Sequence, residues 1–321
     1  MKTPLVIVVI PCYRVRAKLR GVVGRIGPEV GRIIIVDDAC PENSSQAVVG
    51  QDPRLEIIVH EKNRGVGGAM RTGFERAIAL GADIVVKLDG DGQMDPAAIP
   101  SLIAPVLAGE ADFCKCNRFF HLADLREMPW LRVFGNSSLS FLVKASSGYW
   151  QLMDPTNGFF ALDAKLVRLL PLDRIARDYF FEIDLLFRLY TIGAVVAEVP
   201  QAARYEDENS SLSIGQTLLT FPHRIIRSFC KRIFYAYFLR DFNLGTIYLT
   251  VGLLATSFGV NFGIWHWLLS AATGRFSSPG TVMLAALPTA LGLQMLLAFL
   301  QFDVARVPRD PLAKRLFYLP K

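Results

Sequence analysis

Two long uncharged segments near the carboxyl end constrain the fold of this chain more than any other feature. No Asp, Glu, Lys or Arg occurs between Asp241 and Arg275, or between Arg275 and Asp303. The apolar stretches within these limits, roughly residues 244–272 and 281–302, each reach the ~20 residues that a helix needs to span a bilayer. Helices of this length without a charged face are rare in soluble proteins. The sequence therefore predicts two transmembrane helices, with a pair of buried core helices as the alternative.

Basic residues flank both segments, whereas the short connection between them carries only Arg275. The flanking cations are Arg224, Arg227, Lys231, Arg232 and Arg240 on one side and Arg306, Arg309, Lys314 and Arg315 on the other. Cation-rich flanks face the cytoplasm by the positive-inside rule. We therefore interpret the net charge of +6 as attraction to an anionic lipid bilayer rather than to nucleic acid. The sequence predicts a multi-pass protein of the inner (cytoplasmic) membrane whose larger part lies in the cytoplasm.

The segment 216–242, just before the first apolar stretch, mixes cations with large apolar side chains. The apolar members are Ile225, Ile226, Phe229, Ile233, Phe234, Tyr237 and Phe238. This composition favours a helix that lies in the membrane interface. The alternative is an ordinary amphipathic helix packed on the preceding domain.

The first two thirds of the chain alternate between strand and helix patterns. Strand-like apolar runs lie at 5–10, 33–36, 55–59, 84–88, 111–116 and 194–200, with helical patterns near 16–26, 44–51, 67–80, 96–109 and 179–192. This alternation is typical of an α/β fold, in which helices cover both faces of a mostly parallel sheet.

The strand-like run 84–88 leads directly into a loop rich in carboxylates, Asp89-Gly90-Asp91-Gly92-Gln93-Met94-Asp95-Pro96. Open α/β sheets bind ligands at the carboxyl ends of their strands. A bend at Gly90 would let Asp89 and Asp91 face one cation. Hard oxygen ligands suit Mg²⁺ or Mn²⁺, which commonly bridge protein carboxylates to substrate phosphates. A solvated acidic turn is the alternative reading.

Two further runs lie at the ends of predicted strands, on the same edge of the sheet as the carboxylate loop: Pro11-Cys12-Tyr13 and Val36-Asp37-Asp38. Four acidic groups on one edge repel each other unless a cation or hydrogen-bond donors offset their charge, and we interpret their convergence as a ligand site. Tyr13 is suited to stack on a base, and Asp38 to accept a hydrogen bond from a base N–H or a ribose hydroxyl.

A glycine-rich loop, Asn63-Arg64-Gly65-Val66-Gly67-Gly68-Ala69, follows the third strand and opens a helix. Glycines allow the backbone to approach a ligand, and a helix amino terminus favours anions. The spacing differs from that of a Walker loop and of a dinucleotide-binding fingerprint, so neither an ATPase nor a dehydrogenase is supported.

The five cysteines, Cys12, Cys40, Cys114, Cys116 and Cys230, show no metal-ligand spacing. Reduced thiols facing the cytosol fit their odd number and the absence of a signal-peptide pattern.

Taken together, these motifs resemble the family-2 glycosyltransferases of the GT-A fold. The matching runs are Pro11-Cys12-Tyr13, Val36-Asp37-Asp38, the loop from Asn63 to Ala69, Asp89 to Pro96, Asn117-Arg118-Phe119 and Asp154-Pro155-Thr156-Asn157-Gly158-Phe159. With the two carboxy-terminal apolar segments, the chain is similar to the branch that glycosylates polyprenyl phosphates, the dolichol-phosphate mannose synthase type.

The resemblance implies roles for residues on the donor side. Pro11, Tyr13, Val36 and Asp38 would frame a nucleotide-sugar donor, together with Gly65, Asp89 and Gly90. Asp89, Asp91 and Gln93 would hold Mg²⁺ or Mn²⁺ against the diphosphate.

On the acceptor side, the resemblance implies that Arg118, Arg132 and Arg204 grip the phosphate of the lipid, since a guanidinium suits that geometry. Arg126 is a rival for Arg132. Asp154 would lie near the sugar and the attacking oxygen. Glu182 would border the acceptor site, with a solvated helix face as the alternative.

Two departures from the family pattern bear on specificity. Relatives often carry Tyr-Asn-Glu where this chain has Tyr13-Arg14-Val15, so an acidic contact to the base is missing and the nucleotide stays open. The second departure is that the loop that follows Arg204 contains no lysine. Separately, the chain has no Gln-X-X-Arg-Trp run, and this absence argues against a processive polysaccharide synthase.

The resulting hypothesis is a metal-dependent, inverting glycosyltransferase that moves one sugar from a UDP- or GDP-sugar to undecaprenyl or dolichyl phosphate at the cytoplasmic membrane face. The predicted organisation is a GT-A catalytic domain (1–215), an amphipathic juxtamembrane segment (216–242), a transmembrane hairpin (243–304) and a basic tail (305–321). One alternative is transfer to another lipid or an envelope glycan. The other is a membrane scaffold that binds nucleotide sugar without turnover. Self-association is left open by the sequence.

Overall fold

The computed structural model describes the backbone of residues 3–119, 130–201 and 214–316. The chain divides into two compact units. Unit 1 comprises Met1–Phe229 and Pro308–Lys321, and unit 2 comprises Cys230–Val307.

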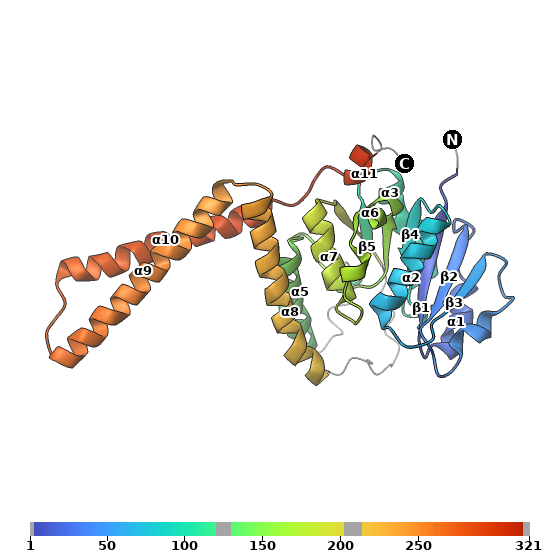
Figure 1. The fold of residues 1–321 in the computed structure, drawn as a ribbon, viewed down its shortest axis with the longest axis horizontal. Helices are drawn as coiled ribbons and strands as arrows, with labels where there is room; N and C mark the ends of the chain where they lie inside the picture. The colour runs from blue at the N-terminus through green and yellow to red at the C-terminus, as the bar shows by residue number, and fades with distance from the viewer. Residues whose placement is uncertain (1–2, 120–129, 202–213, 317–321) are drawn as a thin grey trace. The chain divides into compact units, whose positions relative to one another are not determined.

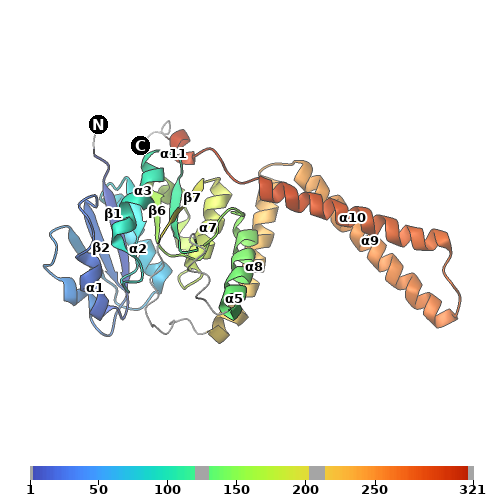
Figure 2. The same ribbon diagram turned by 180° about the vertical axis from the view of Figure 1, so that it is seen from behind.

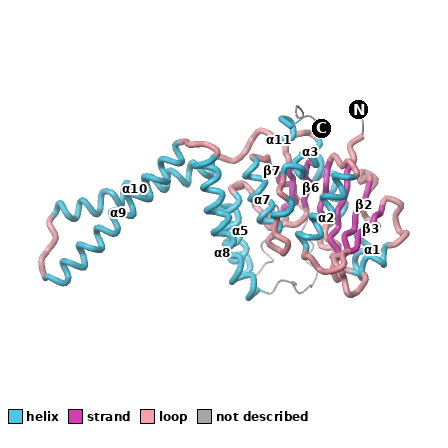
Figure 3. Tube along the Cα trace, viewed as in Figure 1, coloured by secondary structure: helices cyan, strands magenta, loops and turns pink. Residues whose placement is uncertain are grey.

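Unit 1 is built on one seven-stranded sheet, which Figure 3 shows in magenta. Its strands are β1 (Val6–Cys12), β2 (Arg32–Asp37), β3 (Leu55–Val59), β4 (Ile84–Lys87), β5 (Phe113–Asn117), β6 (Phe160–Asp163) and β7 (Val196–Pro200). The spatial order is β3-β2-β1-β4-β6-β5-β7. Only β6 runs antiparallel to its neighbours β4 and β5, and the other four pairings are parallel. The predicted mostly parallel α/β sheet is therefore confirmed.

Helices cover both faces of this sheet, as the two opposite views in Figure 1 and Figure 2 show. Those of unit 1 are α1 (Arg16–Val23), α2 (Val66–Ala79), α3 (Ile99–Leu107), α5 (Trp130–Ser147), α6 (Ala164–Leu169), α7 (Phe181–Ile192), the first part of α8 (Ile214–Phe234) and the short α11 (Leu312–Arg315). Short 3₁₀ segments occur at Ser44–Val48, Pro96–Ala98 and Leu172–Arg174.

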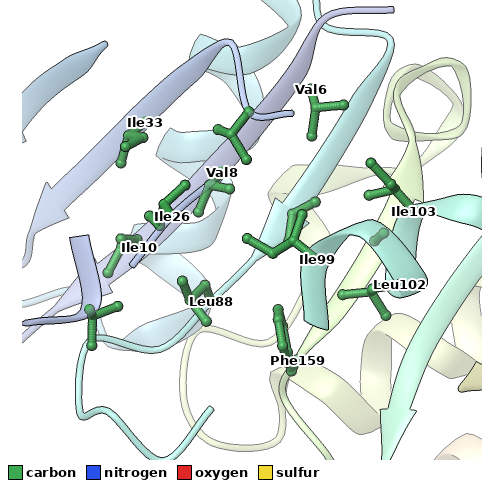
Figure 4. Packing of buried hydrophobic residues seen from close by; sticks show 14 of the residues in the cluster. Val6, Val8, Ile10, Ile26, Ile33, Leu88, Ile99, Leu102, Ile103 and Phe159 are labelled. Carbon is green, nitrogen blue, oxygen red and sulfur yellow. The ribbon is translucent and has the colours of Figure 1, made fainter. Parts of the chain in front are cut away.

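The core follows from the alternation of side chains along the strands. Val6, Val8 and Ile10 of β1 point to one face, where they join buried residues of α1 and α3 (Figure 4). On the other face, Gly73 of α2 lies so close to Val9 that a Cβ there would clash with the valine side chain. Aromatic contacts between Phe160 and Phe181, 6.4 Å between ring centroids, extend this second layer to α7.

The tail returns to unit 1 after the apolar helices. The buried Asp112 accepts hydrogen bonds of 2.7 Å from the backbone N–H groups of Leu312 and Ala313 at the start of α11. A third donor, Val195 N, lies 2.7 Å away. Asp112 precedes β5, so the tail docks at the edge of the sheet opposite the carboxyl ends of the parallel strands.

Unit 2 contains the two apolar helices, α9 (Leu244–Thr273) and α10 (Pro279–Ala305), preceded by a π-helical turn at Tyr235–Leu239. Both are long and apolar enough to cross a membrane, and only 11% of each apolar window is buried. That exposure argues against the alternative of soluble core helices.

The two helices cross at small residues, which let helix backbones approach closely. A Cβ on Gly292 would clash with Thr256, and one on Gly259 with Thr289. At the base of the hairpin the buried Asp303 of α10 pairs with Arg232, at 2.6 and 2.9 Å, and accepts a 2.7 Å hydrogen bond from Tyr237.

Candidate active site

The loops that follow β1, β2 and β4 lie at the same edge of the sheet, at the carboxyl ends of these parallel strands. In β1 and β2, Cys12 pairs with Asp37, so the loops that follow these strands leave side by side. Strand β4 pairs with β1 up to Lys87, opposite Val9, and Leu88 N donates to Val9 O at 3.1 Å. The carboxylate loop therefore begins at the same edge.

Asp37 and Asp38 are buried there and engaged by donors from their own domain. Asp37 accepts from Cys40 N at 2.8 Å and from the Ser45 hydroxyl at 2.5 Å. Asp38 accepts from His60 Nδ1 (2.7 Å), Arg64 N (2.8 Å) and Gly65 N (2.7 Å). Hydrogen-bond donors thus offset both charges, and Asp38 holds the glycine-rich loop in place.

The glycines of that loop allow close packing against another backbone segment. Gly67 N donates to Arg177 O at 2.8 Å. A Cβ on Gly65, whose φ is +77°, would clash with Arg177 O, and one on Gly67 would clash with Ala176 O. These positions therefore need glycine because the chain at 176–178 lies against them.

Tyr13 and Arg14 are exposed in the loop that follows β1. The Tyr13 side chain is 42% exposed, and the Arg14 guanidinium carbon is 5.4 Å from the centroid of its ring. Arg14 has φ +56°, an uncommon conformation for a non-glycine residue, and its N–H donates to Cys40 Sγ at 3.1 Å. Pro11 pairs with Val36 across β1 and β2, so these two predicted donor residues are adjacent.

A buried lysine lies at the centre of this edge. The Lys87 ammonium is 2.9 Å from Asp89 Oδ1 and 3.1 Å from Glu182 Oε1, and its side chain is 1% exposed. Burial favours the neutral amine, but the charges of Asp89 and Glu182 outweigh burial and hold the pKa of Lys87 above its usual value. A Cβ on Gly158 would lie 2.5 Å from Lys87 Nζ, so the loop from Asp154 to Phe159 also packs here.

Asp89 and Asp91 were predicted to hold a divalent cation, and their surroundings suit that role. Asp89 is 28% exposed, and Asp91 Oδ1 accepts a hydrogen bond of 3.0 Å from Gln93 N. Among the residues whose positions are described, no cluster of three or more His, Cys, Asp or Glu side chains forms a self-sufficient metal site. Two carboxylates completed by substrate phosphates are a common arrangement for Mg²⁺, so the donor set fits such an ion.

Asp154 and Arg118 form a second charged pair. Arg118 Nε and Nη2 donate to the two carboxylate oxygens of Asp154 at 2.7 and 3.0 Å. Asp154 is completely buried, whereas the Arg118 side chain is 40% exposed. Burial raises the pKa of the Asp154 carboxyl. The hydrogen bonds and charge of Arg118, together with the charge of Lys115, lower this pKa by more than burial raises it, so it lies below its usual value.

Lys115 and Glu198 support this pair from the strands. Lys115 Nζ donates to Pro155 O at 2.7 Å, and Glu198 accepts from Met153 N and Asp154 N at 2.8 and 2.9 Å. Burial lowers the pKa of Lys115 to about 8 against the opposing charges of Asp154 and Glu198. For the carboxyl of Glu198 burial has the opposite effect and raises the pKa. The loop that carries Asp154 is thus fixed from two neighbouring strands.

The other arginines predicted to bind the acceptor phosphate are Arg132, its rival Arg126, and Arg204. Arg132 lies in α5, of which the structure describes the backbone at that position. Arg126 and Arg204 lie outside the described residues.

The comparisons with known proteins bear on this arrangement. The family model described as "Glycosyl transferase family 2" matches residues 7–170. The chain belongs to glycosyl transferase family 2.

Relatives within the family carry specific names. The chain is 29% identical over 195 residues to a UDP-N-acetylglucosamine–dolichyl-phosphate N-acetylglucosaminyltransferase of Methanococcus voltae, covering 56% of this chain and 77% of the relative. It is 28% identical over 206 residues to a polyprenol monophosphomannose synthase of Mycolicibacterium smegmatis, covering 62% and 77%. An undecaprenyl-phosphate mannosyltransferase of Micrococcus luteus is 28% identical over 201 residues, covering 61% and 82%.

Among solved structures, glucosyl-3-phosphoglycerate synthase from Mycobacterium tuberculosis, in complex with Mn²⁺, UDP-glucose and phosphoglyceric acid, superposes with a TM-score of 0.55. The match covers 71% of this chain and 79% of the synthase at 20% identity. It supports the predicted GT-A fold.

Sequence reasoning missed three charged residues that pack against the candidate site: Lys87, Lys115 and Glu198. Each sits in a strand, and the signal was available, because lysine and glutamate are almost never fully buried unless paired. Lys115 stands between two cysteines of β5, and Lys87 ends the apolar run of β4. A charged residue inside a strand of a covered sheet should be read as a partner of nearby opposite charges.

Proposed function

We propose that this family-2 protein is a membrane-anchored, metal-dependent, inverting glycosyltransferase that moves one sugar from a nucleotide diphosphate sugar to a polyprenyl phosphate. The names of the relatives supply the acceptor class. The observation that carries the proposal is that a carboxylate loop and a buried carboxylate–arginine pair lie at the same edge of the sheet. Asp89 and Asp91 suit a metal-bound diphosphate, and the half-exposed Arg118, braced by Asp154, suits a phosphate.

On this proposal, Mg²⁺ or Mn²⁺ held by Asp89 and Asp91, with Gln93 beside them, would offset negative charge on the departing nucleoside diphosphate. Pro11, Tyr13, Val36 and Gly65 would frame the nucleotide. Asp38 would act indirectly, since its carboxylate already orders the backbone at Arg64 and Gly65.

The chemistry requires little from a general base. The acceptor phosphate is already an oxyanion at neutral pH, so its oxygen attacks the anomeric carbon as the bond to the diphosphate breaks, with inversion and without loss of a proton. Catalysis then depends on positioning and electrostatics. Asp154 suits positioning, because it is buried and both its oxygens bind Arg118.

We also propose that α9 and α10 span the inner membrane with both flanks in the cytoplasm. In this organisation residues 1–215 are the catalytic domain, 216–242 lie in the interface, 243–304 form the transmembrane hairpin and 305–321 the cytoplasmic tail. The exposed aromatic residues Phe234, Tyr235, Phe238 and Phe242 suit an interfacial position.

A donor screen tests the proposal. Membranes containing the protein are incubated with labelled UDP- and GDP-sugars and a polyprenyl phosphate, with Mg²⁺, Mn²⁺ or a chelator. We expect an acid-labile lipid product with one donor class, dependent on the divalent ion and lost in Asp91→Ala. Absence of a lipid product with every donor would refute the proposal, and near-normal turnover by Asp91→Ala would remove the metal role.

A further inference from the structure

The short segment Ala176–Glu182, which we call the bridging segment, contacts three functional parts of unit 1. It joins the 3₁₀ turn at Leu172–Arg174 to the first residues of α7. None of its residues except Glu182 was singled out from the sequence. Its contacts nevertheless reach both proposed donor loops and helix α8.

The first contact is with the glycine-rich loop. Gly67 N donates to Arg177 O, and neither Gly65 nor Gly67 has room for a Cβ against the carbonyls of Arg177 and Ala176. The opposite side of this loop is held by Asp38 through Gly65 N. A shift of the bridging segment must therefore move the loop or break this packing, because backbone atoms in contact cannot yield as side chains can.

The second contact is with the carboxylate loop. Glu182, at the end of the bridging segment, pairs with Lys87 at 3.1 Å, and Lys87 in turn pairs with Asp89. The orientation of Asp89 is thus linked to the same segment through one buried ammonium group.

The third contact is with α8. Arg224 Nη1 lies 2.6 Å from Asp178 Oδ2, and its guanidinium carbon lies 4.3 Å from the centroid of the Phe180 ring. Phe180 also packs edge-on against Phe221 of the same helix, with 5.5 Å between centroids. A planar guanidinium that both pairs with a carboxylate and stacks on an aromatic face has a defined position.

Helix α7 also holds the bridging segment, because Phe181 N donates to Asp178 O at 3.0 Å and Asp184 N donates to Phe180 O at 2.9 Å. Asp184 accepts from Ala176 N at 2.9 Å and from Arg188 Nε at 3.0 Å, and Arg188 also donates to Arg174 O. The contacts of Asp178 and Phe180 with Arg224 add a further constraint on this turn, from an element other than α7.

We infer that Arg224, which lies on α8 and outside both donor loops, is a positioning residue for the nucleotide site. It acts through Asp178 and Phe180 on the backbone that supports Gly65 and Gly67. The inference rests on the proposed function in that the ligand is a nucleoside diphosphate with a divalent ion. Its consequence is that the helix proposed to lie at the membrane surface sets the affinity for the soluble donor.

The test measures nucleotide affinity rather than turnover. Full-length protein in detergent is titrated with UDP and with GDP in the presence of Mn²⁺ by calorimetry, comparing wild type with Arg224→Gln and Asp178→Asn. We expect each variant to raise the Kd of the bound nucleotide about three- to tenfold, equivalent to about 0.6–1.4 kcal/mol. The binding stoichiometry should stay unchanged, whereas partial unfolding would lower it.

Two further variants separate positioning from a general charge effect. Arg227→Gln removes the same charge from an exposed position three residues along α8 and should leave the Kd unchanged. Reversal of the pair, Asp178→Arg with Arg224→Asp, should recover part of the affinity lost in either single reversal.

Equal Kd values for wild type and Arg224→Gln would overturn the inference, as would equal losses in Arg224→Gln and Arg227→Gln. Failure of the reversed pair to improve on the single reversals would also count against it. If wild type binds neither nucleotide with Mn²⁺, the proposed function itself fails, which is a distinct result.

Discussion

Exchange of Asp154 for asparagine removes the charge that orients Arg118 while keeping nearly the same shape. The pair is joined by two short bonds, at 2.7 and 3.0 Å, between a fully buried carboxylate and a guanidinium that is 40% exposed. Each charge-assisted bond of this kind typically contributes about 1.5–3 kcal/mol. Because water can replace part of the Arg118 interaction, we expect a coupling energy between the two side chains of about 2–3 kcal/mol.

If Asp154 acts by orienting Arg118, this coupling appears as non-additivity in a double-mutant cycle. At saturating donor, Asp154→Asn and Arg118→Gln should each lower kcat/KM for polyprenyl phosphate roughly 30- to 150-fold, since 1.4 kcal/mol corresponds to a factor of ten. The double variant should lose no more than the worse single variant.

Thr156→Val supplies the matched control, because Thr156 makes only a 3.4 Å hydrogen bond to the same carboxylate. Its kcat/KM should fall less than about threefold. Losses that multiply in the double variant would refute the orienting role. A complete loss in Asp154→Asn beside a near-normal Arg118→Gln would instead indicate that Asp154 acts directly on the reacting atoms.

Three further outcomes follow from the buried charges. Lys87→Met leaves two carboxylates without their shared cation, and we expect the free energy of unfolding to fall by about 3 kcal/mol; an unchanged denaturation midpoint would contradict the ion-pair assignment. The folded pKa of Lys115, about 8, lies below its ordinary value of 10.5, so burial of the charged ammonium destabilises the folded protein fully below pH 8. This destabilisation fades as the pH rises towards 10.5, because the folded protein releases the proton at a lower pH than the unfolded chain does. Wild type should therefore gain stability relative to Lys115→Met between pH 7.5 and 10, by on the order of 3 kcal/mol, and a constant difference would exclude the shift. Cys230 is exposed, whereas Cys12, Cys40, Cys114 and Cys116 are buried, so a water-soluble maleimide at pH 7 should label one thiol rapidly in wild type and none rapidly in Cys230→Ser; rapid labelling that persists in that variant would contradict the burial of the other four.

The pattern of apolar runs was enough to predict the sheet, because covered parallel strands are apolar on both faces. Each of the first four strand-like runs became a strand that ends within two residues of the expected position. The two charge-free segments became the two long helices for an equally local reason. The insertion of the antiparallel β6 between β4 and β5 depends on pairing between distant segments, and no local pattern predicted it.

The site was less predictable, because its residues are defined by partners remote in sequence. Asp38 reads as a ligand residue beside the strand end, yet its oxygens bind His60 and the backbone at Arg64 and Gly65. The glycine loop reads as a ligand cradle, yet its tightest contacts are with residues 176–178. Both ligand roles stay predictions, and the sequence did not reveal the partners inside the protein that only the folded chain brings together.

The charges at the sheet edge divide accordingly into two sets. Asp37 and Asp38 are buried and accept hydrogen bonds from the backbone of the neighbouring loops. Asp89, at 28% exposure, and Arg118, at 40%, are the better placed to meet substrate. This division makes the carboxylate loop and the Arg118 pair the centre of the account.

The central claim is transfer of a single sugar to a lipid phosphate, and mass spectrometry of the lipid tests it most directly. Purified full-length protein is incubated with polyprenyl phosphate, Mn²⁺ and the donor selected by the screen, and the lipid is then extracted. The account predicts one new species, heavier than the acceptor by one sugar residue and linked through an acid-labile phosphodiester. A ladder of longer glycans, or unmodified lipid beside a protein that binds the donor tightly, would contradict it.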